Sequence, residues 1–141
     1  ICGTYGQYLW HLNYIRQVLA RDGLRPVGAL SLMILDDGPL FIADTQVHHD
    51  PSPEQVADSA VAAARHARRF GVTPKVALCS HSQFGNLDTA SGVKMRAALE
   101  ILDAREPGFA YEGEMHVDAA LDPEIRERLL PGSRLEGAAN I

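Results

Sequence analysis

The sequence predicts a three-layer α/β/α domain, with helices on both faces of a mainly parallel sheet that includes one β-hairpin. Short apolar runs alternate with helical patterns from residue 29 onward. The later runs are separated by helices long enough to form crossover connections between parallel strands. By contrast, only the short turn at 36–39 separates the runs at 29–35 and 40–43, and turns of this length join antiparallel neighbours.

The composition is that of a globular domain of ordinary size. The 141 residues are 46% hydrophobic and 22% charged, and the formal net charge is −5. Because no basic face offsets this charge, we expect no nucleic-acid partner. No apolar run approaches the ~20 residues of a membrane span, so we expect no membrane partner. The two cysteines form no disulfide framework, which favours a reducing, cytoplasmic location.

The first helix is predicted at about 5–22 as a lead-in to the domain. Its apolar positions, Tyr8, Leu12, Ile15 and Leu19, recur at helical spacing, and Gly23 is the expected cap. The strand at 29–35 is almost continuously apolar, so we expect it to be covered on both faces.

The clearest helix starts at Ser52, where Pro53 suits the first helical position and Gln55 completes a capping box. Its alanine-rich stripe predicts close packing on a sheet. It ends at Gly71 and is followed by a short buried strand at 76–79.

Caps and apolar spacing also predict the elements that follow residue 79. Ser91 is the expected cap of the next helix, whose inward positions are Met95, Ala98, Leu99 and Leu102, with Arg96 among those facing outward. We expect a strand at 109–111, a short helix starting at 122–124 and the beginning of another strand at 138–141.

The candidate binding segment is the polar turn after the strand at 76–79. Ser80 and Ser82 offer hydroxyl groups, and Gly85 permits a close backbone approach. The turn leads into a helix whose N-terminus favours an anion. The alternative interpretation is an ordinary strand-to-helix connection that is polar because it is exposed to solvent.

Other chemistries have weaker support in the sequence. We expect no metal, because the histidines and neighbouring acids lack ligand spacing: His48, His49, Asp50, His81, His116 and Asp118. There is no nucleophile elbow, dinucleotide fingerprint or P-loop. Cys79 is expected to be a core thiol. The acidic segment at 112–118 could supply a general base, although a strand-end loop is the preferred interpretation.

Five segments stand out in order along the chain: ICGTYG at 1–6, LFIADT at 40–45, RFGVTPKVAL at 69–78, SHSQFG at 80–85 and DAALDPE at 118–124. Together they resemble the phosphate acetyl/butyryltransferase family, and most of all the transacetylase-like C-terminal region of bacterial NADP-dependent malic enzymes. Two positions depart from the pattern: His48 replaces a frequent Asn, and Gln7 replaces an Arg. The resemblance covers the whole chain.

The resemblance implies an isocitrate/isopropylmalate dehydrogenase-like architecture, in which two α/β/α subdomains flank a cleft. Residues 1–141 would form one such subdomain with its lead-in helix, as part of a larger protein. The family's catalytic Ser-Arg and Asp have no counterpart in them, so we expect no catalytic residue here. The expected ligand-binding residues for acetyl-CoA, another acyl-CoA or a phosphate ligand are Thr4, Gly6, Ser80, Ser82, Gln83, Gly85 and Asn86.

The resemblance leaves two functions open. The first is a non-catalytic regulatory and oligomerisation module of an NADP-dependent malic enzyme, which converts malate to pyruvate, with acetyl-CoA as effector. NADP and a divalent metal would then bind in the separate malic-enzyme domain, with no cofactor in this chain, and the assembly would be a homo-oligomer. The alternative is part of an active phosphate acetyltransferase, which moves acetyl between CoA and phosphate.

Overall fold

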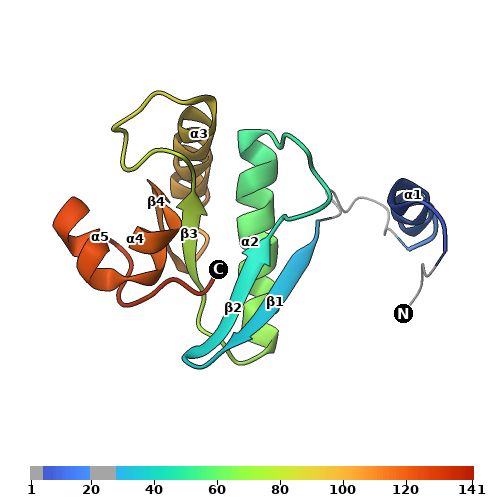
Figure 1. The fold of residues 1–141 in the computed structure, drawn as a ribbon, viewed down its shortest axis with the longest axis horizontal. Helices are drawn as coiled ribbons and strands as arrows, with labels where there is room; N and C mark the ends of the chain where they lie inside the picture. The colour runs from blue at the N-terminus through green and yellow to red at the C-terminus, as the bar shows by residue number, and fades with distance from the viewer. Residues whose placement is uncertain (1–4, 20–27) are drawn as a thin grey trace.

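A computed structural model describes residues 5–19 and 28–141 (Figure 1). The predicted Gly23 cap and Thr4 lie outside the described residues. The elements in chain order are α1 (Tyr8–Val18), β1 (Leu30–Leu35), β2 (Gly38–Ala43), α2 (Pro53–Arg69), β3 (Lys75–Cys79), α3 (Ala90–Arg105), β4 (Ala110–Met115), α4 (Val117–Leu121) and α5 (Pro123–Leu129).

The described strands form two small sheets rather than the single sheet that we expected. β1 and β2 form the predicted antiparallel hairpin, and β3 pairs with β4 in parallel. β2 and β3 are not hydrogen-bonded to each other. Instead, the last residues of the chain lie between them: the Phe41 N–H donates to the Asn140 carbonyl, and the Ala77 N–H donates to the Ile141 carbonyl, both at 2.9 Å.

Helices cover both faces of the β3–β4 pair. On one face, Val76 and Leu78 pack with buried residues of α2 and α3, including Ala60 and Leu102. On the other, Ala77 packs with a second cluster that contains residues of α4 and α5. This alternation follows from the two-residue period of a strand, and it confirms a mixed α/β fold.

Helix α2 confirms the start predicted from sequence. The Ser52 hydroxyl accepts a hydrogen bond from the Gln55 N–H, and the Gln55 side chain accepts one from the Ser52 N–H at 2.8 Å. The expected close packing is also present, because five alanines of the helix are buried: Ala57, Ala60, Ala63, Ala64 and Ala67.

One expectation about the N-terminal half was wrong. β1 is largely exposed, with Ile34 at 79%, because within the described residues it pairs only with β2 and forms the outer strand of its sheet. In α1 only Leu12 is buried, while Leu19, which follows the helix, is 71% exposed. Figure 1 shows the reason: α1 lies to one side of the molecule, apart from the hairpin and from the body formed by α2 to α5. Spacing identified the helix but not what would cover it.

Three further details differ in the C-terminal half. The N-cap of α3 is Thr89 rather than Ser91, and its side chain accepts from the Gly92 N–H. β4 extends to Met115, past the expected end of the strand, and α4 follows where a loop was favoured. The last helix begins as predicted, with the Asp122 carboxylate accepting from the Glu124 and Ile125 N–H groups.

Candidate functional site

The loop from β3 to α3, residues 80–89, is organised around a buried carboxylate on β4. Glu114 is fully buried. Its Oε2 accepts from the Ser80 hydroxyl at 2.5 Å, and its Oε1 accepts from the Ser82 hydroxyl at 2.9 Å and the Gly85 N–H at 2.7 Å. Arg96 of α3 supplies the opposite charge, with its Nη1 donating to Oε1 at 3.0 Å. The loop is thus folded onto one anionic group.

Ser82, one of the expected ligand-binding residues, belongs to this buried network and is not accessible on the surface of the turn. The residue is fully buried. Besides Glu114, its Oγ lies 3.0 Å from both the Asn86 Oδ1 and the Leu87 carbonyl, and it accepts from the Leu87 N–H at 3.2 Å. A hydroxyl has one proton and two lone pairs, so these partners occupy its hydrogen-bonding capacity.

The environment keeps Glu114 ionised. Burial by itself would raise the pKa of its carboxyl, but hydrogen bonds from Ser80, Gly85, Ser82 and Arg96 outweigh burial and hold the pKa below its usual value. The negative charge therefore persists at neutral pH, where it fixes the loop.

The other predicted loop residues are placed closer to the surface. Gly85 is exposed and adopts a left-handed φ of 84°, which favours glycine. Asn86 is exposed and accepts from the Gln83 N–H at 2.9 Å through its side chain. Gln83 is half-buried. These three share one loop with Ser80, which is also half-buried.

The structure does not bring Gly6 to this loop. Gly6 precedes α1, on the far side of the molecule from the β3–α3 loop (Figure 1). Thr4 lies outside the described residues. The candidate ligand set therefore reduces, within this structure, to the β3–α3 loop.

The central residues of the network are not among the ligand-binding residues predicted from sequence. The sequence favours a strand-end loop for the segment that contains Glu114, and helical spacing places Arg96 on the outward face of its helix. A usable signal is present: Glu114 follows the apolar run at 109–111 closely, and a carboxylate buried by an extension of that strand needs a partner. No local pattern, however, says which cation will reach it.

The end of the loop that leads into α3 leaves backbone N–H groups without hydrogen-bond partners. Thr89 caps α3 by accepting from the Gly92 N–H at 3.0 Å. The N–H groups of Ala90 and Ser91 have no hydrogen bond within the described residues. Free N–H groups in the first turn of a helix attract anions, so this end of the loop can receive a negatively charged group.

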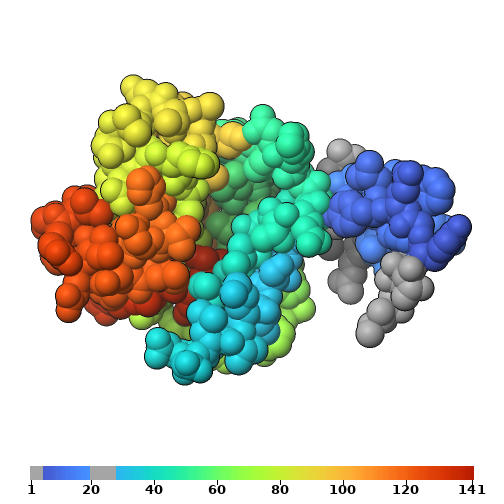
Figure 2. Space-filling model, viewed as in Figure 1, coloured from blue at the N-terminus to red at the C-terminus, as the bar shows by residue number. Residues whose placement is uncertain are grey.

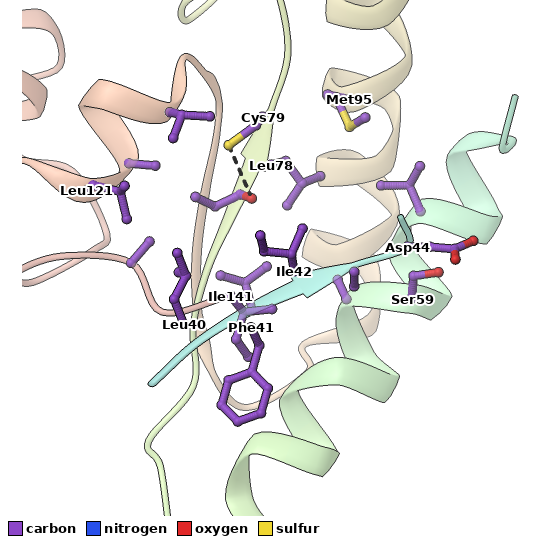
Figure 3. A pocket seen from close by; sticks show the side chains of 18 of the residues that line it. Leu40, Phe41, Ile42, Asp44, Ser59, Leu78, Cys79, Met95, Leu121 and Ile141 are labelled. Atoms are coloured by element: carbon purple, nitrogen blue, oxygen red, sulfur yellow. Dashed lines mark hydrogen bonds between the residues drawn. The ribbon is translucent and has the colours of Figure 1, made fainter. Parts of the chain in front are cut away.

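A second feature is an apolar groove of about 340 Å³ between β2 and β3 (Figure 3). Its walls include Ile42 of β2, Leu78 of β3, Met95 of α3 and Leu121 of α4. In Figure 2 the surface is hollowed between the hairpin and the α4–α5 region.

Cys79 lines this groove and is exposed there, so the expectation of a core thiol was wrong. It ends β3 at the edge of the sheet that faces the groove. Desolvation by the surrounding protein nevertheless raises the pKa of its thiol, which disfavours the reactive thiolate.

Asp44 lines the same groove at the end of β2. Burial would raise the pKa of its carboxyl, but hydrogen bonds from the Ala29 N–H, His48 and the Val47 N–H lower it. The ring of His48 contacts this carboxylate directly. This histidine is thus held within its own loop.

Within residues 5–19 and 28–141, no group of three or more His, Cys, Asp or Glu side chains could hold a metal ion. In the same part of the chain, no helix has the length and apolarity needed to cross a membrane.

Comparison with known proteins gives the family. The profile described as phosphate acetyl/butaryl transferase matches residues 1–141. The chain belongs to this family. The match extends over every segment on which the sequence resemblance rested, including the whole β3–α3 loop.

Named relatives fall into two groups. An NADP-dependent malic enzyme of Salmonella typhimurium is 50% identical over 100% of this chain and 19% of its own length. A phosphate acetyltransferase of Synechocystis sp. is 36% identical over 88% of this chain and 18% of its own length. A solved phosphotransacetylase from Streptococcus pyogenes superposes with a TM-score of 0.78 at 31% identity, over 85% of this chain and 37% of that one. The chain thus spans about a fifth of the length of these curated relatives.

Proposed function

We propose that this chain is a non-catalytic regulatory module of an NADP-dependent malic enzyme, and that it binds acetyl-CoA at the β3–α3 loop. The observation that supports this choice most is the similarity of the whole chain to malic enzymes, at 50% identity, against 36% over a shorter stretch for a phosphate acetyltransferase. NADP and a divalent metal would bind in a separate malic-enzyme domain.

The chemistry of the loop favours binding over catalysis. A nucleophile or general base must be free to reach a substrate. Ser82 is buried and its hydroxyl is engaged with Glu114, while the pKa of Glu114 is lowered and its oxygens already accept several hydrogen bonds. Both groups act as the scaffold that gives the loop its shape.

The binding surface in this proposal is the outer side of that scaffold. The free N–H groups of Ala90 and Ser91 would receive a phosphate or carbonyl oxygen of acetyl-CoA, and Gln83 of the same loop would add a side-chain amide. A helix N-terminus contributes only about 0.3–1 kcal/mol at an exposed site, so further contacts from the rest of the assembly are needed. The homo-oligomer expected for this protein would supply them.

The test is malate turnover by the full-length protein against acetyl-CoA concentration. Ala90→Asp places a carboxylate at the exposed first position of α3, where acidic residues suit the helix, so the fold should persist. Its charge should repel an anionic ligand by about 1 kcal/mol, which raises the concentration for half-maximal response roughly three- to ten-fold.

Ala90→Asn is the matched control, because it has nearly the same shape without the charge. It should respond as the wild type does. Identical curves for Ala90→Asp and the wild type would show that the loop is not the sensor. A wild-type enzyme that ignores acetyl-CoA would leave oligomerisation as the better account of this module.

A second function, part of an active phosphate acetyltransferase, is favoured by the likeness to solved phosphotransacetylases. Formation of acetyl phosphate from acetyl-CoA by the full-length protein distinguishes the two. Turnover that Ala90→Asp reduces and Ala90→Asn does not would support the transferase.

A further inference from the structure

We propose that a pocket at the start of the parallel β3–β4 pair binds a phosphorylated small molecule, whose phosphoryl group is held by Lys75 and Arg68. The pocket has a volume of about 590 Å³ and lies between the end of α2, the first residues of β3 and the segments at 108–110 and 134–136. We call it the basic pocket. It is separate from the β3–α3 loop, which follows the other end of β3 (Figure 1). The five residues of the strand place roughly 16 Å between the two.

The basic pocket concentrates positive charge in a chain that is acidic as a whole. Its lining includes one acid, Glu136, and three cations: Arg68, Lys75 and Arg134. The formal net charge of the chain is −5. A local cluster of positive charge raises the concentration of anions beside it. The charge of the lining therefore points to an anionic ligand.

Two of the three cations are available to a ligand. Arg134 is already paired, because its Nη1 lies 2.6 Å from Asp103 and its Nη2 lies 3.5 Å from Glu112. Lys75 and Arg68 form no ion pair within residues 5–19 and 28–141. Lys75 is also half-buried, so its ammonium group has lost part of its hydration. An anion in the pocket would compensate for that loss.

The backbone around these two cations is fixed before any ligand binds. The Asn140 side chain accepts from the Lys75 N–H at 2.8 Å and donates to the Thr73 carbonyl at 2.9 Å. Arg68 donates to the Gly108 carbonyl at 2.6 Å, which ties the end of α2 to the segment before β4. A preformed pocket loses less conformational entropy on binding than one that must first be ordered.

The walls of the basic pocket offer neutral donors and apolar surface as well as charge. Within the described residues, the N–H groups of Thr73, Gly108 and Phe109 donate no hydrogen bond to the backbone. N–H groups of this kind add charge-assisted hydrogen bonds to phosphate oxygens. Val72 and Phe109 are half-buried and line the pocket, so they can contact an organic group. A volume of about 590 Å³ is typical of small-molecule sites, which favours a phosphate ester of nucleotide size over inorganic phosphate.

The test uses the full-length protein, with AMP as the probe and adenosine, which lacks the phosphoryl group, as its control. Hydrogen exchange followed by mass spectrometry reports the segments at 71–76 and 107–110 directly, so AMP bound elsewhere does not obscure the result. At ten times the Kd found in the same titration, exchange of the covered amides should slow by about ten-fold. Adenosine should leave it unchanged. Unchanged exchange at millimolar AMP, or equal protection by adenosine, would overturn the proposal.

Charge variants test the residues. Lys75→Gln should weaken the affinity measured at these segments by roughly ten-fold, whereas Lys75→Arg keeps the charge and should retain the affinity. Arg68→Gln should also weaken it, while its amide can still donate to the Gly108 carbonyl. Arg65→Gln is the matched control, because it removes the same charge from an exposed position of α2 outside the pocket. Wild-type affinity in both Lys75→Gln and Arg68→Gln, or an equal loss in Arg65→Gln, would overturn the assignment.

Ala90→Asp separates this inference from the proposed function. It changes the β3–α3 loop at the other end of β3, so protection of residues 71–76 by AMP should match that of the wild type, whatever happens to the response to acetyl-CoA. Loss of this protection in Ala90→Asp would show that the basic pocket is not a separate site.

Discussion

Two fully buried charges organise this domain in opposite ways. Glu114 is paired with a formal cation, Arg96, and with hydroxyl and N–H donors of the β3–α3 loop. Arg126 of α5 is 2% exposed and donates only to backbone carbonyls, those of Ala119 at 2.9 Å, Ala120 at 3.2 Å and Leu135 at 3.0 Å, together with that of Gly137. Within the described residues no carboxylate pairs with it.

The difference shows two ways of fixing a chain segment. A carboxylate only accepts hydrogen bonds, so Glu114 binds the side-chain and backbone donors of a polar loop. A guanidinium has five donors in a planar fork and no acceptor, so Arg126 binds backbone carbonyls. The carbonyls of Ala119 and Ala120 lie in the last turn of α4, where carbonyl groups have no partner within the helix. The carbonyls of Leu135 and Gly137 belong to the segment that leads to residues 140–141 between β2 and β3. Glu114 shapes the candidate binding loop, whereas Arg126 positions the C-terminal segment.

The largest effect is expected for Glu114→Ala. It removes the buried acceptor that Ser80, Ser82, the Gly85 N–H and Arg96 share, although Arg96 keeps Asp88 and the hydroxyls keep weaker partners. The loss of four hydrogen bonds to one buried charge should cost about 3–5 kcal/mol of unfolding free energy. Urea denaturation measures this value. A loss below about 1 kcal/mol would mean that the loop is not held by this carboxylate.

Arg126→Ala should cost somewhat less, about 2–4 kcal/mol, because it removes donors to neutral carbonyls, whereas Glu114→Ala removes the acceptor of several hydrogen bonds and of a cation. Hydrogen exchange should also show faster exchange at Ala77, whose N–H depends on the C-terminal segment, while Gly85 keeps its protection. Loosening of the β3–α3 loop instead would contradict the separation of the two regions.

The pH dependence of stability separates the charge of Glu114 from its shape. The folded-state pKa of Glu114 lies below its ordinary value, so its contribution is complete above the unfolded pKa of about 4.3 and is lost as the pH falls through the folded value. The stability difference between the wild type and Glu114→Gln should therefore narrow between pH 5 and pH 3. Denaturation curves in which this difference stays constant would argue against an ionised Glu114.

The smallest effect is expected for Asp88→Asn, which removes the other partner of Arg96. This ion pair is 2.6 Å long, but Asp88 is 86% exposed, so solvent and salt screen it. The expected loss is at most about 1 kcal/mol by urea denaturation. A loss approaching that of Glu114→Ala would show that Arg96 is positioned from the surface rather than from the buried network.

Local chemistry made several elements predictable from the sequence. The capping box of Ser52 and Gln55 joins residues three apart, and the short turn at 36–39 permits only an antiparallel pairing of its flanking strands. The cap of the last helix at Asp122 is equally local. The family resemblance also needed no coordinates, because it rests on residue identities in order along the whole chain.

Tertiary structure alone decided which side chains are buried and which partners they meet. The bond between Ser82 and Glu114 joins residues 32 apart, so no local pattern shows that this loop hydroxyl is a core group. An apolar strand such as β1 is buried only if another element covers it, and an apolar helix such as α1 is subject to the same condition. The sequence determined the elements and the family because these depend on near neighbours and residue identity. Burial and charge pairing depend on long-range packing.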